Sequence, residues 1–162
     1  MSVGNHQKAP ELRVPYWIDG DGNDRAPLKL SELGNGYKII YCFQSWCQGC
    51  HSRGFRTLKK LVDNLSGRGF GFAVVQTVFE GEDKNTREKL RETQAQYKLN
   101  IPFGHDSKNG QYPSVMEDYK SGGTPWFILI NPKGEVVFND FGLDADKLIN
   151  AMSQDDVELA PA

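Results

Sequence analysis

The pattern of apolar positions along the chain predicts alternating strands and helices. Residues 38–44 and 70–79 form two continuous apolar runs rich in β-branched and aromatic residues, as expected of buried central strands. Between them, four apolar residues follow the i, i+3, i+4, i+7 spacing of an amphipathic helix: Leu58, Leu61, Val62 and Leu65. Gly54 precedes them and favours a kink in that helix. The pattern therefore predicts a β-α-β unit.

The middle of the chain is more polar. Asn85 followed by Glu88 resembles a capping box, and it predicts a polar helix that runs to about Tyr97. Residues 101–103 follow as a short extended piece, which predicts an additional strand. Pro113 is well placed for the first turn of another short helix.

The last third predicts a hairpin and a helix. The apolar run 126–130 is followed by Asn-Pro-Lys-Gly at 131–134, a sequence suited to a type I turn, so the strand 135–140 should return antiparallel. Four apolar residues then repeat at helical spacing: Ala145, Leu148, Ile149 and Met152.

The N-terminal part predicts a smaller hairpin. The apolar segment 14–18 leads into the turn-forming residues 19–23, which suggests a hairpin at the edge of the domain. We expect flexible tails over residues 1–13 and 154–162, and one domain over residues 14–153. The element order predicts an α/β fold in which a mixed β-sheet has helices on both faces.

Composition narrows the class of protein. The chain has 162 residues, 38% of them hydrophobic, which suits one domain with a real core. A net charge of −2 and scattered Lys and Arg give no indication of binding to nucleic acid or to a membrane surface. The polar N-terminus lacks the apolar run of a secretory signal, and no apolar run is long enough to span a bilayer, so we expect a cytoplasmic protein.

The candidate chemistry lies between the first strand and the first helix, in the stretch from Trp46 to His51. Cys47 and Cys50 form a CxxC motif, which can close a disulfide, bind a metal or attach a haem. A strand-to-helix junction places Cys47 at a helix N-terminus, where free N–H groups favour a thiolate. Cys47 is therefore the expected nucleophile, Cys50 the resolving thiol, and Trp46 a shield on one side.

The haem and metal alternatives are weaker. Cys47–His51 matches the CxxCH motif for haem attachment, with His51 as axial ligand, but the β-α-β surroundings do not suit a small cytochrome. A structural zinc site needs four ligands, and the sequence contains no second CxxC. We therefore expect no metal and no haem at this site.

A second motif lies far downstream at Thr124-Pro125. If this peptide bond is cis, the loop can lie against the CxxC motif. The backbone of Thr124 could then pair with an extended substrate segment.

Together, these motifs resemble those of thioredoxin-like proteins. Three features are shared: the WCxxC motif at 46–50 with the strand that precedes it, Gly-Thr-Pro at 123–125, and the segment ILINPKGE at 128–135. Within this superfamily, residues 28–152 resemble the TlpA and ResA disulfide reductases and the peroxiredoxin-like redoxins. The resemblance implies a thioredoxin-like fold with an extra helix and strand. It also implies thiol–disulfide exchange through Cys47 and Cys50 without a bound cofactor, with a protein or small-molecule disulfide as substrate and a separate reductant.

The chain departs from these relatives at the positions of two carboxylates. Tyr41 stands where thioredoxins usually carry a buried Asp, and Arg53 stands where TlpA-like proteins usually carry a Glu. His51 and Glu80 are then the candidates for the proton partner of Cys50. Gln44 occupies the place of the peroxiredoxin Thr, which argues against peroxidase activity.

Three further residues have less specific expectations. Cys42 lies within the apolar strand and should be a buried, inert thiol, whereas His105 has no evident partner and is expected at the surface or in a loop. Trp126 suits either the substrate groove or the core. Two other functions remain open: a peroxide-reducing redoxin and a non-catalytic binding module.

Overall fold

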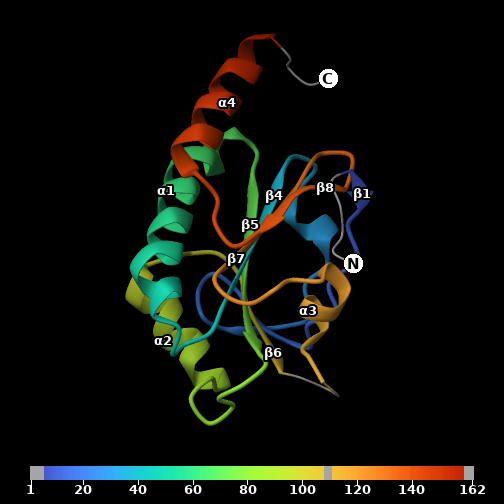
Figure 1. Cartoon of the computed structure of the whole chain (residues 1–162). Helices are drawn as coiled ribbons and strands as arrows, with labels where there is room; N and C mark the ends of the chain where they lie inside the picture. The colour runs from blue at the N-terminus through green and yellow to red at the C-terminus, as the bar shows by residue number, and fades with distance from the viewer. Residues whose placement is uncertain (1–5, 108–110, 159–162) are drawn as a thin grey trace.

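An eight-stranded mixed sheet organises the chain (Figure 1). The computed structural model describes residues 6–107 and 111–158. The centre of the sheet is β4 (Lys38–Phe43), which pairs parallel with β5 (Gly71–Val78) and antiparallel with β7 (Trp126–Ile130). The sheet order is β1-β8-β7-β4-β5-β6-β2-β3.

The remaining strands extend the sheet on both sides. β6 (Phe103–Ser107) runs parallel to β5, and β8 (Glu135–Asp140) returns antiparallel to β7. The edges are formed by short strands: β2 (Tyr16–Ile18) with β3 (Asp24–Arg25) on one side, and β1 (Gln7–Lys8) on the other. The hairpin predicted from residues 14–23 and the one predicted over 126–140 are therefore confirmed.

Helices cover both faces of the sheet (Figure 1). On one face lie α1 (Phe55–Leu65), α2 (Arg87–Tyr97) and α4 (Ala145–Glu158), over a core rich in Phe and Leu. On the other face lie α3 (Ser114–Tyr119) and the segment around the 3-10 helix Leu30–Leu33, over a second core. A 3-10 turn, Ser66–Arg68, ends α1. This arrangement confirms the predicted α/β class and the mixed sheet.

Two predicted boundaries differ from the structure. Residues 7–13 were expected in a flexible tail, yet β1 pairs with β8, and Ala9 and Leu12 are buried in the second core. This segment joins the sheet because it completes the β8 edge and covers apolar surface. At the other end, the backbone of α4 continues past residue 153 to Glu158, whereas residues 1–5 and 159–162 lie outside the described residues.

The predicted capping box at Asn85 is also wrong. The N-cap of α2 is Thr86, and no side chain caps it. The Asn85 side chain points instead toward the loop after β4, where its Oδ1 accepts a hydrogen bond from the Ser45 backbone N–H. A tertiary contact thus replaces the local cap.

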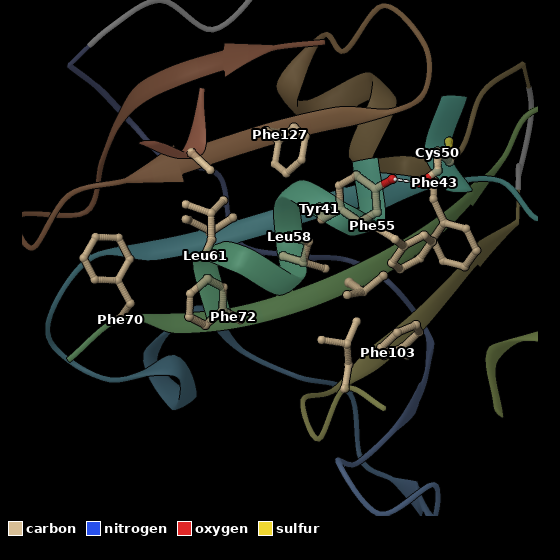
Figure 2. Close-up of a cluster of buried hydrophobic side chains, with 14 of the residues drawn as sticks. Tyr41, Phe43, Cys50, Phe55, Leu58, Leu61, Phe70, Phe72, Phe103 and Phe127 are labelled. Carbon is tan, nitrogen blue, oxygen red and sulfur yellow. Dashed lines mark hydrogen bonds between the residues drawn. The ribbon is translucent and has the colours of Figure 1, made fainter. Parts of the chain in front are cut away.

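The kink expected at Gly54 is a π-helical turn, Cys50–Gly54, that leads into α1. In this turn the Cys50 carbonyl accepts hydrogen bonds from the Phe55 backbone N–H and, at 2.9 Å, from the Tyr41 hydroxyl (Figure 2). A Cβ on Gly54 would lie only 1.9 Å from the Tyr41 hydroxyl oxygen. Because Gly54 has no side chain, the Tyr41 hydroxyl can reach the Cys50 carbonyl. Side chains that insert into a helix in this way commonly make it irregular.

Candidate active site

Cys47 and Cys50 are joined as a disulfide where the chain passes from β4 to the helix. Their Cα atoms are 5.3 Å apart, within the range of unstrained disulfides. Cys47 retains 6% of its surface exposed, whereas Cys50 is fully buried beneath it. Only the first cysteine is therefore open to a substrate, as the sequence predicts.

The Cys47 sulfur lies at the start of the helical segment. The Cys50 backbone N–H donates a hydrogen bond to Cys47 Sγ at 3.2 Å, and the His51 N–H donates to the Cys47 carbonyl. An N–H aimed at the sulfur stabilises negative charge there, and the N-terminal end of the helix acts in the same direction. Both effects favour a thiolate on Cys47 when the disulfide is reduced.

The Thr124-Pro125 peptide bond is cis, which meets the condition stated for this loop to lie against the CxxC motif. Pro125 lies against the CxxC turn, because a Cβ added to Gly49 would be 3.6 Å from Pro125 Cδ. The cis-proline loop thus lies next to the CxxC turn, although the two are far apart in the sequence.

Trp46 is 43% exposed and lies beside a loop that follows β5. The backbone of Gly81 adopts a positive φ of 67°, and a Cβ there would lie 3.1 Å from the Trp46 indole nitrogen. The loop can therefore approach the indole closely only with glycine at this position. Glu80 lines the same surface hollow as Trp46, and it is exposed.

His51, a candidate proton partner, is held by two hydrogen bonds. Its Nε2 lies 2.7 Å from the Ser45 carbonyl oxygen and its Nδ1 lies 2.5 Å from the Tyr97 hydroxyl. A carbonyl only accepts, so Nε2 carries the hydrogen, and in the neutral ring Nδ1 accepts from Tyr97. The ring also stacks on Phe55 and Tyr97. Both nitrogens of His51 thus have partners other than the cysteine sulfurs.

Tyr41 occupies the buried position behind the disulfide. Burial raises its pKa further above the ordinary value, with the neighbouring Cys42 and Tyr97 adding to the effect. The hydroxyl therefore stays neutral and donates to the Cys50 carbonyl. Within the described residues, Glu80 makes no side-chain hydrogen bond. The side chain behind the disulfide is thus a neutral phenol.

A polar network that the sequence analysis missed holds the loop before Cys47. The Ser45 hydroxyl donates to Gln76 Oε1 at 2.5 Å, and Gln76 Nε2 lies 2.9 Å from His105 Nδ1. Asn85, which also donates to the Glu80 and Gly81 carbonyls, fixes the Ser45 backbone. Buried polar residues at the carboxyl ends of two parallel strands were the signal available in the sequence.

His105 was expected at the surface or in a loop, and this prediction is wrong. It lies in β6 with 8% of its surface exposed. Burial, with a smaller contribution from the positive charge of Arg87, lowers the pKa of His105 to about 4. The ring is therefore neutral near pH 7, and it forms the inner end of the network.

Three other residues lie as follows. Cys42 is a fully buried free thiol whose pKa is raised by burial, which confirms the predicted burial. Gln44 is fully buried. Trp126 is 6% exposed, donates through its indole N–H to Asn139 Oδ1, and supports Phe141 edge-on.

A groove of about 480 Å³ lies between the cis-proline loop and the start of the helix that follows the CxxC motif. Arg53 and Thr57 form one wall, Thr124 and Pro125 the second, and the segment 141–143 after β8 the third. Among residues 6–107 and 111–158, no three His, Cys, Asp or Glu side chains group as a metal ion would require. No helix in these ranges is long and apolar enough to cross a membrane.

Solved structures of other proteins share this fold. A protein of the thioredoxin-like superfamily is similar in structure at 29% identity, with a TM-score of 0.78 and coverage of 90% of this chain and 92% of that one. A thiol-disulfide isomerase from Corynebacterium glutamicum is similar at 24% identity and a TM-score of 0.73, with 89% and 93% covered. The thioredoxin domain of a thiol-disulfide oxidoreductase from Bacteroides vulgatus is similar at 22% identity and a TM-score of 0.70, with 94% and 98% covered.

The sequence comparisons identify the family. No curated protein matches the sequence. The family model described as AhpC/TSA matches residues 6–139, which include the disulfide, the network and the cis-proline loop. The chain therefore belongs to the AhpC/TSA family.

Proposed function

We propose that this protein is a thiol–disulfide oxidoreductase. The observation that carries the proposal is the Cys47–Cys50 disulfide, with one sulfur accessible at a helix N-terminus and the other buried, set against a cis-proline loop. The similar thiol-disulfide isomerase and oxidoreductase structures support it. The disulfide itself stores and releases two electrons, so the proposed reaction needs no bound cofactor.

The reaction starts from the reduced pair. The Cys47 thiolate attacks one sulfur of a substrate disulfide, forming a mixed disulfide and releasing the other substrate sulfur as a thiolate that takes up a proton. Cys50 then loses its proton and attacks Cys47 Sγ. The second substrate thiol leaves, and the protein disulfide re-forms. Two electrons pass from the protein to the substrate, and a separate thiol reductant restores the dithiol.

The surrounding residues position this pair. The Tyr41 hydroxyl and the Phe55 N–H hold the Cys50 carbonyl, while His51, Gln76 and Asn85 hold the Ser45 loop. The His51 nitrogens are occupied and Tyr41 is neutral. We therefore propose that the Cys50 proton passes to the departing substrate thiolate or to water rather than to a fixed carboxylate.

Insulin reduction by dithiothreitol tests the proposal. Catalytic amounts of the protein should accelerate insulin precipitation, and Cys47→Ser should abolish the acceleration. Cys42→Ser is the matched control, because Cys42 is buried away from the disulfide and should leave the rate unchanged. Equal rates for wild type and Cys47→Ser would refute the activity.

Family membership makes peroxide reduction the second function to test. A redoxin of that type would consume hydrogen peroxide in the presence of thiols. The amide of Gln44, fully buried three residues before Cys47, offers no hydroxyl to a bound peroxide. We therefore expect peroxide consumption no faster than that of free dithiothreitol.

A further inference from the structure

The groove on the cis-proline side carries one charged side chain, Arg53, among its lining residues. The position of a Cβ on Gly49 lies 3.0 Å from Arg53 Nη2 and 3.6 Å from Pro125 Cδ. The guanidinium therefore lies beside Gly49 of the active-site turn and lines the groove. A substrate segment that follows the cis-proline loop would pass beside it.

Arg53 has no ion-pair partner within the described ranges, and its side chain is exposed. Two carboxylates lie near this end of the groove, Asp140 as the last residue of β8 and Asp144 after it, and each accepts a hydrogen bond from a nearby backbone N–H. Asp140 Oδ1 accepts from Phe141, and Asp144 Oδ1 accepts from Lys147. The five N–H donors of Arg53 are thus available to an incoming carboxylate, the planar partner that a guanidinium binds best.

The opposite wall of the groove is apolar. Phe141 has 48% of its surface exposed, and its ring packs edge-on against Trp126 with centroids 4.7 Å apart. Gly122 and Gly123 lie close to this ring. A Cβ added to Gly122 would be 3.5 Å from Phe141 Cζ, and one added to Gly123 would be 3.3 Å from Phe141 Cε1. The ring is therefore held in place while presenting its surface to solvent, which suits an apolar side chain of a bound segment.

The other flank of the disulfide has the opposite character. The hollow beside Trp46 is lined by Glu80, Asp83 and Lys84, so carboxylates outnumber cations there. Charge thus changes sign across the disulfide, from acidic at Trp46 to basic at Arg53. A substrate with an acidic side chain on the Arg53 side meets attraction, and one with a basic side chain there meets repulsion.

We propose that the protein selects polypeptide disulfides that carry an acidic side chain, with an apolar one beside it, next to the attacked cysteine. Arg53 binds the carboxylate, and Phe141 packs against the apolar side chain. This proposal rests on the oxidoreductase function and adds a substrate class to it. Arg53 contributes by recognition at the groove, and the exchange chemistry remains that of Cys47 and Cys50.

Three versions of one disulfide-bonded peptide test the selection. They differ only in the residue beside the attacked cysteine, which is Glu, Gln or Lys, and each has a Leu next to that residue. The reduced protein should show the highest kcat/KM for Glu, with about fivefold loss to Gln and a further loss to Lys, since exposed ion pairs are weak. Arg53→Gln should remove the preference and Arg53→Glu should invert it.

Matched variants separate recognition from other effects. Arg56 is exposed on α1, three residues after Arg53, and does not line the groove, so Arg56→Gln should keep the full preference. Phe141→Ala should lower kcat/KM several-fold for the Leu peptides but not for versions with Gly in its place. The Gln peptide should react equally with wild type and Arg53→Gln.

Two results would overturn the selection while leaving the function intact. One is equal kcat/KM for the three peptides in wild type. The other is an equal loss for all three in Arg53→Gln, which would show that Arg53 acts on the Cys47 thiolate instead of on the substrate. Failure to reduce any peptide, together with no acceleration of insulin reduction, would instead refute the oxidoreductase function.

Discussion

Gly54→Ala should destabilise the protein, although alanine normally favours helix. The new methyl would meet the Tyr41 hydroxyl oxygen at 1.9 Å and two ring carbons at 2.8 and 3.0 Å, and both residues are buried. Overpacking of this kind costs about 1–3 kcal/mol. Loss of the hydrogen bond to Cys50 adds about 1 kcal/mol. Alanine propensity returns about 1 kcal/mol. We expect a net loss of about 1–3 kcal/mol in the free energy of unfolding.

Urea unfolding of wild type, Gly54→Ala, Tyr41→Phe and the double variant measures the energetic coupling between these two residues. Tyr41→Phe alone should cost about 1 kcal/mol, because the Cys50 carbonyl keeps the Phe55 N–H as a partner. In the double variant the nearest clashing atom is gone, so the combined loss should be smaller than the sum of the single losses. The disulfide exchange rate should fall with Gly54→Ala, since Cys50 is displaced with its turn.

Gly67→Ala is the matched control. Gly67 lies in the turn after α1, has no heavy atom within 4 Å of its Cβ position, and does not need a positive φ. Its substitution should change stability by no more than about 0.5 kcal/mol. If Gly54→Ala were as neutral as Gly67→Ala, or if the double variant lost the full sum, the claim that the Tyr41 hydroxyl needs the space beside Gly54 would be refuted.

Three further outcomes follow from the buried network. Because burial lowers the pKa of His105 from 6.5 to about 4, the unfolded chain binds its proton first on acidification. Stability should therefore fall by on the order of 2 kcal/mol between pH 6.5 and 4. In thermal melts recorded across this pH range, His105→Gln should show a smaller fall in stability than wild type. Asn85→Ala should cost about 1–3 kcal/mol in urea unfolding, since it leaves the half-buried Ser45 N–H without its acceptor. An equal cost for Asn64→Ala, an exposed site, would contradict this. His51→Gln should keep the pH profile of peptide reduction, and a displaced profile would make His51 the proton partner of Cys50.

The order of strands and helices followed from the sequence because local signals agreed there. Apolar periodicity located β4, α1 and β5, and the turn at 131–134 located the β7–β8 hairpin. The CxxC motif at a strand-to-helix junction pointed to Cys47 as the exposed sulfur. Such features depend on residues close together in the chain, which is why periodicity and motifs describe them well.

Features that depend on distant contacts were missed. The pairing of β1 with β8 joins residues more than a hundred positions apart, and no local pattern marks it. Asn85 has the composition of a cap yet bonds to Ser45, and His105 is buried through Gln76. The sequence offered His51 and Glu80 as candidates for the proton partner of Cys50. The structure gives both His51 nitrogens other partners and keeps Tyr41 neutral.

The assignment of roles to the two cysteines is the central claim, and trapping of the mixed disulfide tests it most directly. The reduced Cys50→Ser variant and the reduced Cys47→Ser variant are each mixed with a disulfide-bonded peptide, and the adducts are located by mass spectrometry. Because Cys47 is accessible and Cys50 fully buried, a stable adduct should accumulate on Cys47 in the first variant and form far more slowly on Cys50 in the second. Equal rates of adduct formation, or a faster reaction at Cys50, would contradict the account.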